Sequence, residues 1–174
     1  STRLCCLEDA NIKSPDPLKG CQISHTFLPH RVGGPQFHIR DLSLSLAEAG
    51  YEVEIVTGYR ARKPERETLA PGVTVTRLPV ISIPLTRKGA AVEIYYRIIP
   101  GLPCHLRRSS AQIFHAHDYF HFSSDMTAWV SRLTGNPMVL TVHSRHGFFT
   151  INPLLKFFEW LYDTTLGPIT LRQA

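Results

Sequence analysis

Apolar, strand-like segments alternate with amphipathic, helix-like segments along most of this chain, and this alternation constrains its fold more than any single motif. The expected strands cover residues 21–27, 51–57, 73–80, 111–116 and 138–142. The expected helices cover residues 35–49, 89–99, 123–133 and 153–166. Strands that alternate with helices favour a parallel α/β sheet. Right-handed crossovers then predict a doubly wound, mostly parallel, Rossmann-like sheet.

Apolar side chains recur at helical spacing in three of the expected helices and predict which faces pack against the sheet. Glycines at Gly50 and Gly135 are suited to end the first and third of them, and Gly167-Pro168 would end the last. The expected inward-facing residues are Ile39, Leu42, Leu46 and Ala49 in the first helix, Met126, Trp129, Val130 and Leu133 in the third, and Leu154, Phe157, Phe158 and Leu161 in the last.

The N-terminal segment shows no apolar periodicity. Residues 1–20 contain Pro15, Pro17 and Gly20 and are predicted to be a leader or disordered extension, which leaves residues 21–174 as one folded domain. The four cysteines form no Cys-x-x-Cys pair, and no apolar run approaches the ~20 residues of a membrane span. We therefore expect a reducing, cytoplasmic location.

The formal net charge of +5 suits a phosphate-bearing ligand or an anionic membrane surface. The sequence has no zinc-finger spacing, RNA-binding signature or dense basic helix, so a nucleic-acid partner is not expected. Arg87-Lys88 and Arg107-Arg108 flank the apolar and aromatic stretch 90–99, which predicts peripheral binding to anionic membrane. The alternative is a helix that packs on the sheet with its basic ends solvated.

Glycine and histidine residues follow three of the expected strands. Gly33-Gly34 and then His38 lie where the first helix begins. Residues 115–118, His-Ala-His-Asp, end the fourth strand with His121 beyond, and residues 143–147, His-Ser-Arg-His-Gly, follow the fifth. Because the carboxyl ends of parallel strands meet at one edge, where such sheets bind ligands, these segments predict a single site.

These residue types have a chemical use at such an edge. Two glycines at a helix start let backbone N–H groups approach a diphosphate, which the helix dipole also favours. A tight turn that needs positive φ is the alternative. His143 ends the most apolar strand and can hydrogen-bond a sugar hydroxyl or a phosphate oxygen. His115 is expected to be structural, bonded to a neighbouring backbone group and pointing away from His117.

Metal binding is the main alternative for these histidines. Asp118 and Asp125 are the local carboxylates, whereas metallohydrolases use paired acidic residues. Because no complete ligand pattern is present, the sequence assigns no metal. A metal-dependent hydrolase and a non-catalytic α/β binding module stay open as alternative functions. The residues of ligand type are His115, His117, Asp118, His121, His143 and His146.

Several segments, in this order, resemble one known family. Residues 27–38, Phe-Leu-Pro-His-Arg-Val-Gly-Gly-Pro-Gln-Phe-His, are similar to the Gly-Gly loop of family-4 glycosyltransferases. Residues 49–57 resemble the family's second strand, residues 113–118 its fourth strand and acceptor-side loop, and residues 139–143 its fifth strand. The likeness extends over residues 21–174 and resembles in particular the catalytic subunits that add N-acetylglucosamine to phosphatidylinositol.

The resemblance implies a GT-B enzyme, in which two Rossmann-like domains face each other across a cleft. Such an enzyme transfers a sugar from a nucleotide-sugar donor to a lipid, glycan or small-molecule acceptor, with retention and without a metal or other cofactor. This chain would be the N-terminal, acceptor-side half. The nucleotide-binding half would lie beyond Ala174 or in a partner chain, so we expect this chain alone to be inactive.

The resemblance also implies roles for individual residues. Gly33 and Gly34 would approach the donor diphosphate. His143 would be the catalytic residue that contacts the donor sugar near the reaction centre. Which sugar, nucleotide and acceptor are used does not follow from the sequence. The residues that would line the acceptor side are His38, His117 and Asp118.

Overall fold

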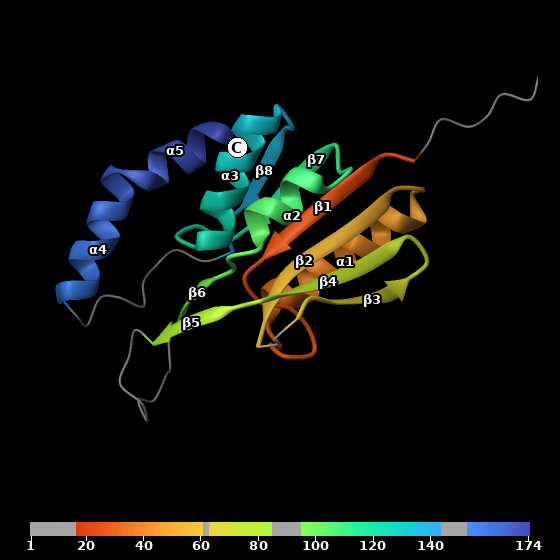
Figure 1. Cartoon of the computed structure of the whole chain (residues 1–174), viewed down its shortest axis with the longest axis horizontal. Coiled ribbons are helices and arrows are strands. Elements are labelled where there is room, and N and C mark those ends of the chain that lie inside the picture. Colours follow the sequence, from red (N-terminus) through yellow and green to blue (C-terminus); the bar gives the residue numbers. More distant parts are fainter. Residues whose placement is uncertain (1–16, 61–62, 85–94, 144–152) are drawn as a thin grey trace, which may run out of the picture.

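The chain folds around one six-stranded sheet in a computed structural model that describes residues 17–60, 63–84, 95–143 and 153–174 (Figure 1). The strand order is β3-β4-β2-β1-β7-β8, and β3 is antiparallel to β4 while the other neighbours are parallel. The strands of this sheet are β1 (Lys19–Ser24), β2 (Glu52–Tyr59), β3 (Glu65–Ala70), β4 (Val73–Pro79), β7 (Ile113–His117) and β8 (Met138–Thr141). A separate two-stranded antiparallel sheet consists of β5 (Ile81–Pro84) and β6 (Tyr95–Ile98).

The strand order confirms the doubly wound, mostly parallel sheet. From the central β1 the chain crosses to β2 and β4 on one side, and it later returns to β7 and β8 on the other. Gln22 of β1 therefore lies between Ile55 of β2 and His115 of β7. The carboxyl ends of the five parallel strands lie along one edge, and the strand order reverses between β1 and β7.

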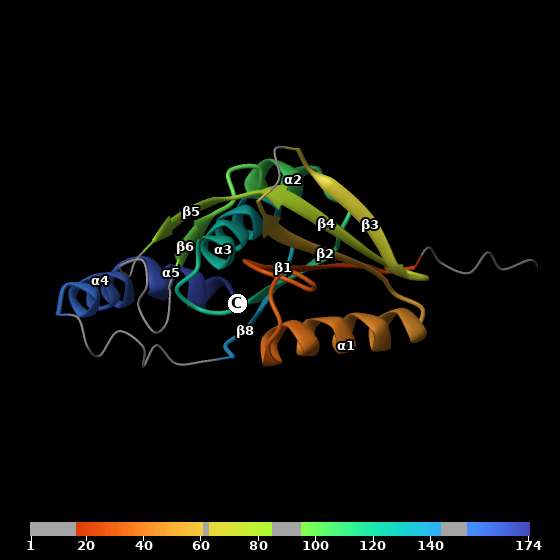
Figure 2. The ribbon, with the colours of Figure 1, turned by 90° about the horizontal axis from the view of Figure 1, so that it is seen from below.

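Helices cover both faces of the sheet (Figure 2). One face is covered by α1, whose Ile39 packs with Val53 and Val75 in a buried cluster. The other face is covered by α2 and α3, whose Leu102 and Val130 belong to a second buried cluster. Each buried side chain of this size contributes about 1.5–3 kcal/mol to folding. The helices are α1 (Gly34–Glu48), α2 (Leu102–Arg108), α3 (Phe122–Thr134), α4 (Pro153–Thr164) and α5 (Leu166–Gln173).

The first helix begins and ends as its sequence predicts. Pro35 lies in the first turn, where its missing N–H is not needed, and Gly50 follows the C-cap with a φ of 89°. Its buried face differs from the prediction because Ala49 is exposed, whereas Gln36 and Ser43 are buried beside Ile39. Helical spacing of apolar residues alone does not reveal such polar core positions, because their burial depends on partners far away in sequence.

The inward face predicted for the third helix is wrong for two of its largest side chains. Trp129 and Leu133 are 50% and 56% exposed. The helix α3 instead buries small residues, which let it lie close to the sheet: Ser123, Ser124, Thr127, Ala128 and Ser131, together with Val130. Most of these hydroxyls bond backbone carbonyls, as Thr127 Oγ1 does with Ser123 at 2.7 Å. Gly135, with a φ of 77°, ends the helix as predicted.

The last predicted helix corresponds to α4 and is followed by a further helix, α5, that was not predicted, and the inward face predicted for it is wrong. Phe157, Phe158 and Leu161 are 52%, 49% and 39% exposed. Instead, polar contacts attach these helices to α3, because Tyr162 Oη and Thr170 Oγ1 both donate to Asp125 at 2.6 and 2.7 Å. Gly167-Pro168 ends no helical region, because both residues lie in the first turn of α5, where proline is tolerated.

The helix predicted over residues 89–99 is wrong in its described part, where Tyr95–Ile98 is the strand β6. The periodicity of apolar residues is not diagnostic in so short a run, so the sequence does not separate strand from helix there. Residues 85–94, including Arg87-Lys88, lie outside the described residues, as do residues 1–16 and the segment 144–152 with His146. The strands β3 and β5 and the helix α2 were not predicted.

Two predicted strands differ in detail from those observed. The strand β1 begins at Lys19 and ends at Ser24, so that Phe27, although buried, belongs to the following loop. The strand β8 lies at the edge of the sheet, and Val139 on it is 42% exposed, so it is not the fully buried strand that its composition suggests. Within the described residues, no helix combines the length and apolar character that crossing a membrane requires.

Candidate functional site

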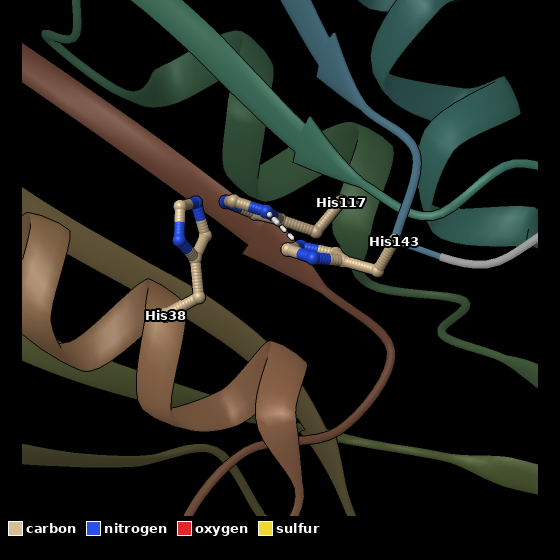
Figure 3. Close-up of side chains that lie close together, drawn as sticks. All are labelled: His38, His117 and His143. Carbon is tan, nitrogen blue, oxygen red and sulfur yellow. Dashed lines mark hydrogen bonds between the residues drawn. The ribbon is translucent and has the colours of Figure 1, made fainter.

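The predicted site residues gather where the strand order reverses. His38 lies on α1 after the loop that follows β1, His117 is the last residue of β7, and His143 follows β8 (Figure 3). Gly33 and Gly34 lie where that same loop enters α1, and Asp118 directly follows His117. The crevice beyond such a reversal is where open α/β sheets bind ligands.

Three histidines converge on this crevice. The rings of His117 and His143 are stacked, with centroids 5.3 Å apart, and His117 Nδ1 lies 3.0 Å from His143 Nε2. The ring of His38 meets that of His143 edge-on, with centroids 5.1 Å apart. His117 is fully buried, His143 is half-buried and His38 is exposed. The cluster therefore extends from the core to the surface, in the order His117, His143, His38.

A chain of buried hydrogen bonds fixes the tautomer of His117. His117 Nε2 lies 2.9 Å from Gln22 Oε1, and because an amide oxygen only accepts, Nε2 carries the proton. Gln22 Nε2 in turn donates to Ser43 Oγ at 2.7 Å, and the Ser43 hydroxyl donates to the carbonyl of Ile39 at 2.8 Å. His117 Nδ1 is consequently an acceptor, and His143 Nε2 must donate to it.

The histidines near the core stay neutral at physiological pH. Burial, followed by the neighbouring histidines, lowers the pKa of His117 to about 2 and the pKa of His115 to about 4. Burial also lowers the pKa of His143, although the charge of Asp118 opposes the change. A neutral His143 that donates through Nε2 keeps Nδ1 as a hydrogen-bond acceptor.

The orientation predicted for His115 is wrong. Residues two apart on a strand share a face, and the rings of His115 and His117 lie with centroids 4.3 Å apart. His115 Nε2 lies 2.7 Å from the Thr141 hydroxyl on β8. His115 therefore hydrogen-bonds a side chain of the neighbouring strand rather than a backbone group.

Asp118 has a φ of 73°, which is uncommon for a residue other than glycine. Its backbone N–H donates to the Thr141 carbonyl at 2.8 Å. Its carboxylate Oδ2 lies 3.8 Å from His25 Nδ1, and the His25 ring stacks on that of His121 with centroids 3.9 Å apart. A positive φ costs conformational energy at a residue other than glycine. At Asp118 this conformation accompanies the contact between the end of β7 and His25, in the loop that follows β1.

The two glycines leave space beside the start of α1. Gly33 has a φ of 179°, an extended backbone open to any residue, and Gly34 has no positive φ, so a turn does not explain them. A Cβ atom at Gly34 would meet nothing within 4 Å, whereas one at Gly33 would come 2.9 Å from Gln36 Oε1. No side chain caps α1 in the described residues, which leaves its first N–H groups suited to an anion.

The loop that carries these glycines is held at its base. The buried guanidinium of Arg77 donates to the Leu28 carbonyl at 2.6 Å and pairs with Glu67 at 2.8 Å. Gln36 Nε2 donates to Thr26 Oγ1 at 3.1 Å. These contacts attach the loop to β4 and to the first turn of α1, so the glycines lie on a fixed support.

Two groups of described residues bring three metal-ligand atoms within 4.8 Å of one another. One group is His38, His117 and His143, and the other is His25, Asp118 and His121. Imidazole nitrogens and carboxylates are suitable zinc ligands. In the first group, however, a direct hydrogen bond already joins two of the nitrogens. The absence of a metal from the reaction stays a prediction.

Comparison with known proteins identifies the family. Residues 32–171 match the family model described as Glycosyltransferase Family 4. This chain belongs to that family. It is also 28% identical over 135 residues to a subunit of the phosphatidylinositol N-acetylglucosaminyltransferase of Homo sapiens. That match spans 78% of this chain but 27% of the human protein, so the chain covers about a quarter of that relative's length.

The family match includes every residue predicted for the site. It confirms the resemblance to family-4 glycosyltransferases and favours that interpretation over a hydrolase or a binding module. The sequence interpretation missed Gln22, Ser43 and His25. One indication was present for Gln22, because a glutamine inside an otherwise apolar buried strand needs a polar partner. The partner itself, His117, lies 95 positions away.

The lowered pKa values predict that acid destabilises the fold. An unfolded histidine titrates near about pH 6.5, so below that pH the unfolded chain binds protons that folded His117 does not. The free energy of unfolding should therefore fall as pH drops through about 6.5, by up to about 1.4 kcal/mol per pH unit from His117. His115 adds to the loss in the same direction.

Urea unfolding at pH 7 and pH 5 measures this effect. The variant His115→Gln should show a smaller difference between the two pH values than the unmodified chain. Equal unfolding free energies at both pH values in the unmodified chain would contradict the neutral, buried state of His117.

Replacing Gln22 by methionine should release the tautomer of His117. Methionine fills a similar volume but accepts no hydrogen bond, so His117 Nε2–H would be left unpaired at a cost of about 1–3 kcal/mol. The imidazole ¹⁵N shifts of His117 should then show a mixture of tautomers. The matched control is Gln36→Met, which removes a buried glutamine that bonds Thr26 instead. Identical ¹⁵N spectra for the two variants would show that Gln22 does not fix the tautomer.

Proposed function

We propose that this chain is the acceptor-side domain of an enzyme that transfers a sugar from a nucleotide-sugar donor to an acceptor hydroxyl, with retention of anomeric configuration. The observation that carries the proposal is the convergence of the Gly33-Gly34 helix start with His38, His117 and His143 at the reversal of strand order. Membership of glycosyltransferase family 4 supports it.

In this proposal the open space at Gly34 admits the donor diphosphate to the N-terminus of α1. The uncapped N–H groups and the helix dipole would stabilise its negative charge. The support beneath the loop, from Arg77 and Gln36, keeps these N–H groups in position before the donor binds. Such preorganisation is the main way in which fixed dipoles lower a barrier.

His143 would accept a hydrogen bond from a hydroxyl of the donor sugar. Its Nε2–H is occupied by His117, which leaves Nδ1 as the acceptor on a half-buried ring. The chain from His143 through His117 to Gln22 fixes which nitrogen is available. His38, which is exposed, and Asp118, which lies beside His25, would contact the acceptor.

The nucleotide would be held by a second domain, which faces this one across the cleft of a GT-B enzyme. The human relative is about four times as long as the matched segment, which leaves room for such a domain in proteins of this kind. The name of that relative includes phosphatidylinositol, which supports a lipid among the acceptor classes, beside a glycan or a small molecule. Action at the cytoplasmic face of a membrane, with peripheral contact through basic residues such as Arg107-Arg108, is part of this proposal.

A radiolabelled-donor assay tests the proposed division of roles. The chain alone and the chain with a supplied nucleotide-binding domain are incubated with several nucleotide sugars and a lipid extract as acceptor. Transfer should need both domains, because half a cleft does not orient the reacting atoms, a contribution of about 7–11 kcal/mol. Robust transfer by this chain alone would overturn the GT-B arrangement, and no transfer by the pair with any donor would argue against the activity.

A further inference from the structure

Three arginines gather beyond the ends of β1 and β2, where the rings of His30 and Tyr59 stack with centroids 3.9 Å apart. This stacking brings Arg31 and Arg60, the residues that follow them in sequence, to the same place. Arg31 lies in the loop after β1, Arg60 directly follows β2, and Arg97 lies on β6 (Figure 1). The guanidinium carbons of Arg60 and Arg97 lie 6.0 and 5.8 Å from the centroid of the Tyr95 ring. Tyr95 and Arg97, two apart on a strand, share the face of β6 that meets Arg60.

No carboxylate balances this cluster within the described residues. The ion pairs formed there by arginines join Arg40 to Asp41 and Arg77 to Glu67, and none includes a member of the cluster. Burial and then the charges of Arg31 and Arg60 lower the pKa of Arg97. Like charges gathered at a half-buried position are costly, and an anion bound among them would remove that cost.

A half-buried histidine beside the cluster has one buried nitrogen without a hydrogen-bond partner in the described part of the chain. His25 Nδ1 is buried and has no hydrogen-bond partner among the described residues, since the Asp118 carboxylate is 3.8 Å away. Arg97 and Arg31 contribute, after burial and His121, to a pKa of His25 well below its usual value. A buried, unsatisfied nitrogen is costly unless a ligand group reaches it.

We propose that Arg31, Arg60 and Arg97 form a subsite for a phosphate group carried by the acceptor. Guanidinium groups match the geometry of phosphate oxygens and hold them by charge-assisted hydrogen bonds. The Tyr95 ring orients two of the three, and His25 can bond a neighbouring hydroxyl or phosphate oxygen. The inference rests on the proposed function for its assignment to the acceptor, whereas the phosphate site itself does not need that function.

The position of the cluster supports the acceptor assignment. Asp118 lies beside His25 on one side and directly follows His117 on the other, so it separates the arginine cluster from the three histidines. The donor diphosphate is already assigned to the helix start at Gly34. An acceptor anchored by its phosphate among the arginines would extend past Asp118 toward the histidine cluster.

Calorimetric titration with glycerol 3-phosphate, and with glycerol as its uncharged counterpart, tests the subsite directly. The full chain should bind the phosphate ester saturably, less tightly at higher salt, and should not bind glycerol. The double variant Arg31→Gln/Arg60→Gln should weaken binding by about tenfold or more. The matched control, Arg132→Gln/Arg172→Gln in the last turns of α3 and α5, removes the same charge at exposed positions elsewhere and should leave the affinity unchanged. Circular dichroism checks that both variants fold.

Vesicles of phosphatidylcholine, with and without phosphatidylinositol, separate two sources of the phosphate. Binding to the phosphatidylinositol vesicles that Arg31→Gln/Arg60→Gln removes supports a lipid headgroup, and binding of the soluble ester alone supports a soluble phosphorylated acceptor. The proposal is overturned if the ester does not bind, or if both double variants weaken the binding of the ester equally. Ester binding in an enzyme that transfers no sugar would contradict the proposed function but not the subsite.

Discussion

Gly34→Val in the two-domain enzyme is expected to lower kcat/KM by about 10²-fold or more, with the fold intact. A Cβ atom at Gly34 meets nothing within 4 Å, so the protein itself accommodates the larger side chain. The space that it fills is the space through which the diphosphate would reach the first N–H groups of α1. A displacement of about 1 Å in the donor suffices for a loss of this size.

The matched control is Gly101→Val, because Gly101 also lies at a helix start with no neighbour within 4 Å of the added Cβ. Its helix, α2, takes no part in the proposed site. Thermal unfolding should shift little in either variant, and nucleotide-sugar affinity should fall only in Gly34→Val. Normal turnover in Gly34→Val would show that the diphosphate does not bind at this helix start.

His143→Ala is expected to lower kcat by about 10²-fold while changing the free energy of unfolding by less than about 1 kcal/mol. His143 is half-buried and follows β8, so its removal leaves little cavity. Among the described residues, His143 supplies the one ring nitrogen that is proposed to bond the donor sugar, and the variant removes it. It also leaves His117 Nδ1 to bond water, which a neutral ring does readily.

The control for His143→Ala is His115→Ala, which removes a histidine of the same cluster that bonds Thr141 and has no proposed role in the reaction. His115→Ala should lower the free energy of unfolding clearly, while kcat should change little. If His143→Ala instead shifts unfolding strongly and leaves turnover unchanged, then His143 is structural and another group contacts the sugar.

The five parallel strands, the helices α1 and α3 and the edge that carries the site followed from the sequence, for reasons that are local. Each signal that was used depends on only a few neighbouring residues. These signals are the strand composition of residues 51–57 and 73–80, the boundaries of the first helix at Pro35 and Gly50, and histidines that directly follow strands. The rule for parallel sheets then brings distant strand ends together without knowledge of side chains. His38, His117 and His143 were placed in one crevice on that basis.

Contacts between side chains could not be predicted from the sequence because they depend on how the elements pack. The α3 helix turns Trp129 outward and buries serines and threonines, since close approach to the sheet favours small residues whose hydroxyls bond local carbonyls. Gln22 and Ser43 lie in apolar surroundings, and the reason for their burial is visible only in the structure, where His117 lies beside Gln22. The arginine cluster was missed because β6 was predicted as helix, which places Tyr95 and Arg97 differently.

The central position of β1 has a consequence for biosynthesis. Gln22 emerges from the ribosome before its partner His117, which is made 95 residues later, and β1 can pair with β7 only then. Closing so long a loop is entropically costly and slows folding. During that interval β1 has one unpaired edge, which is the condition under which nascent chains associate wrongly. We therefore expect nascent chains that end before β7 to recruit chaperones, and the histidine crevice to be among the last parts of the domain to mature.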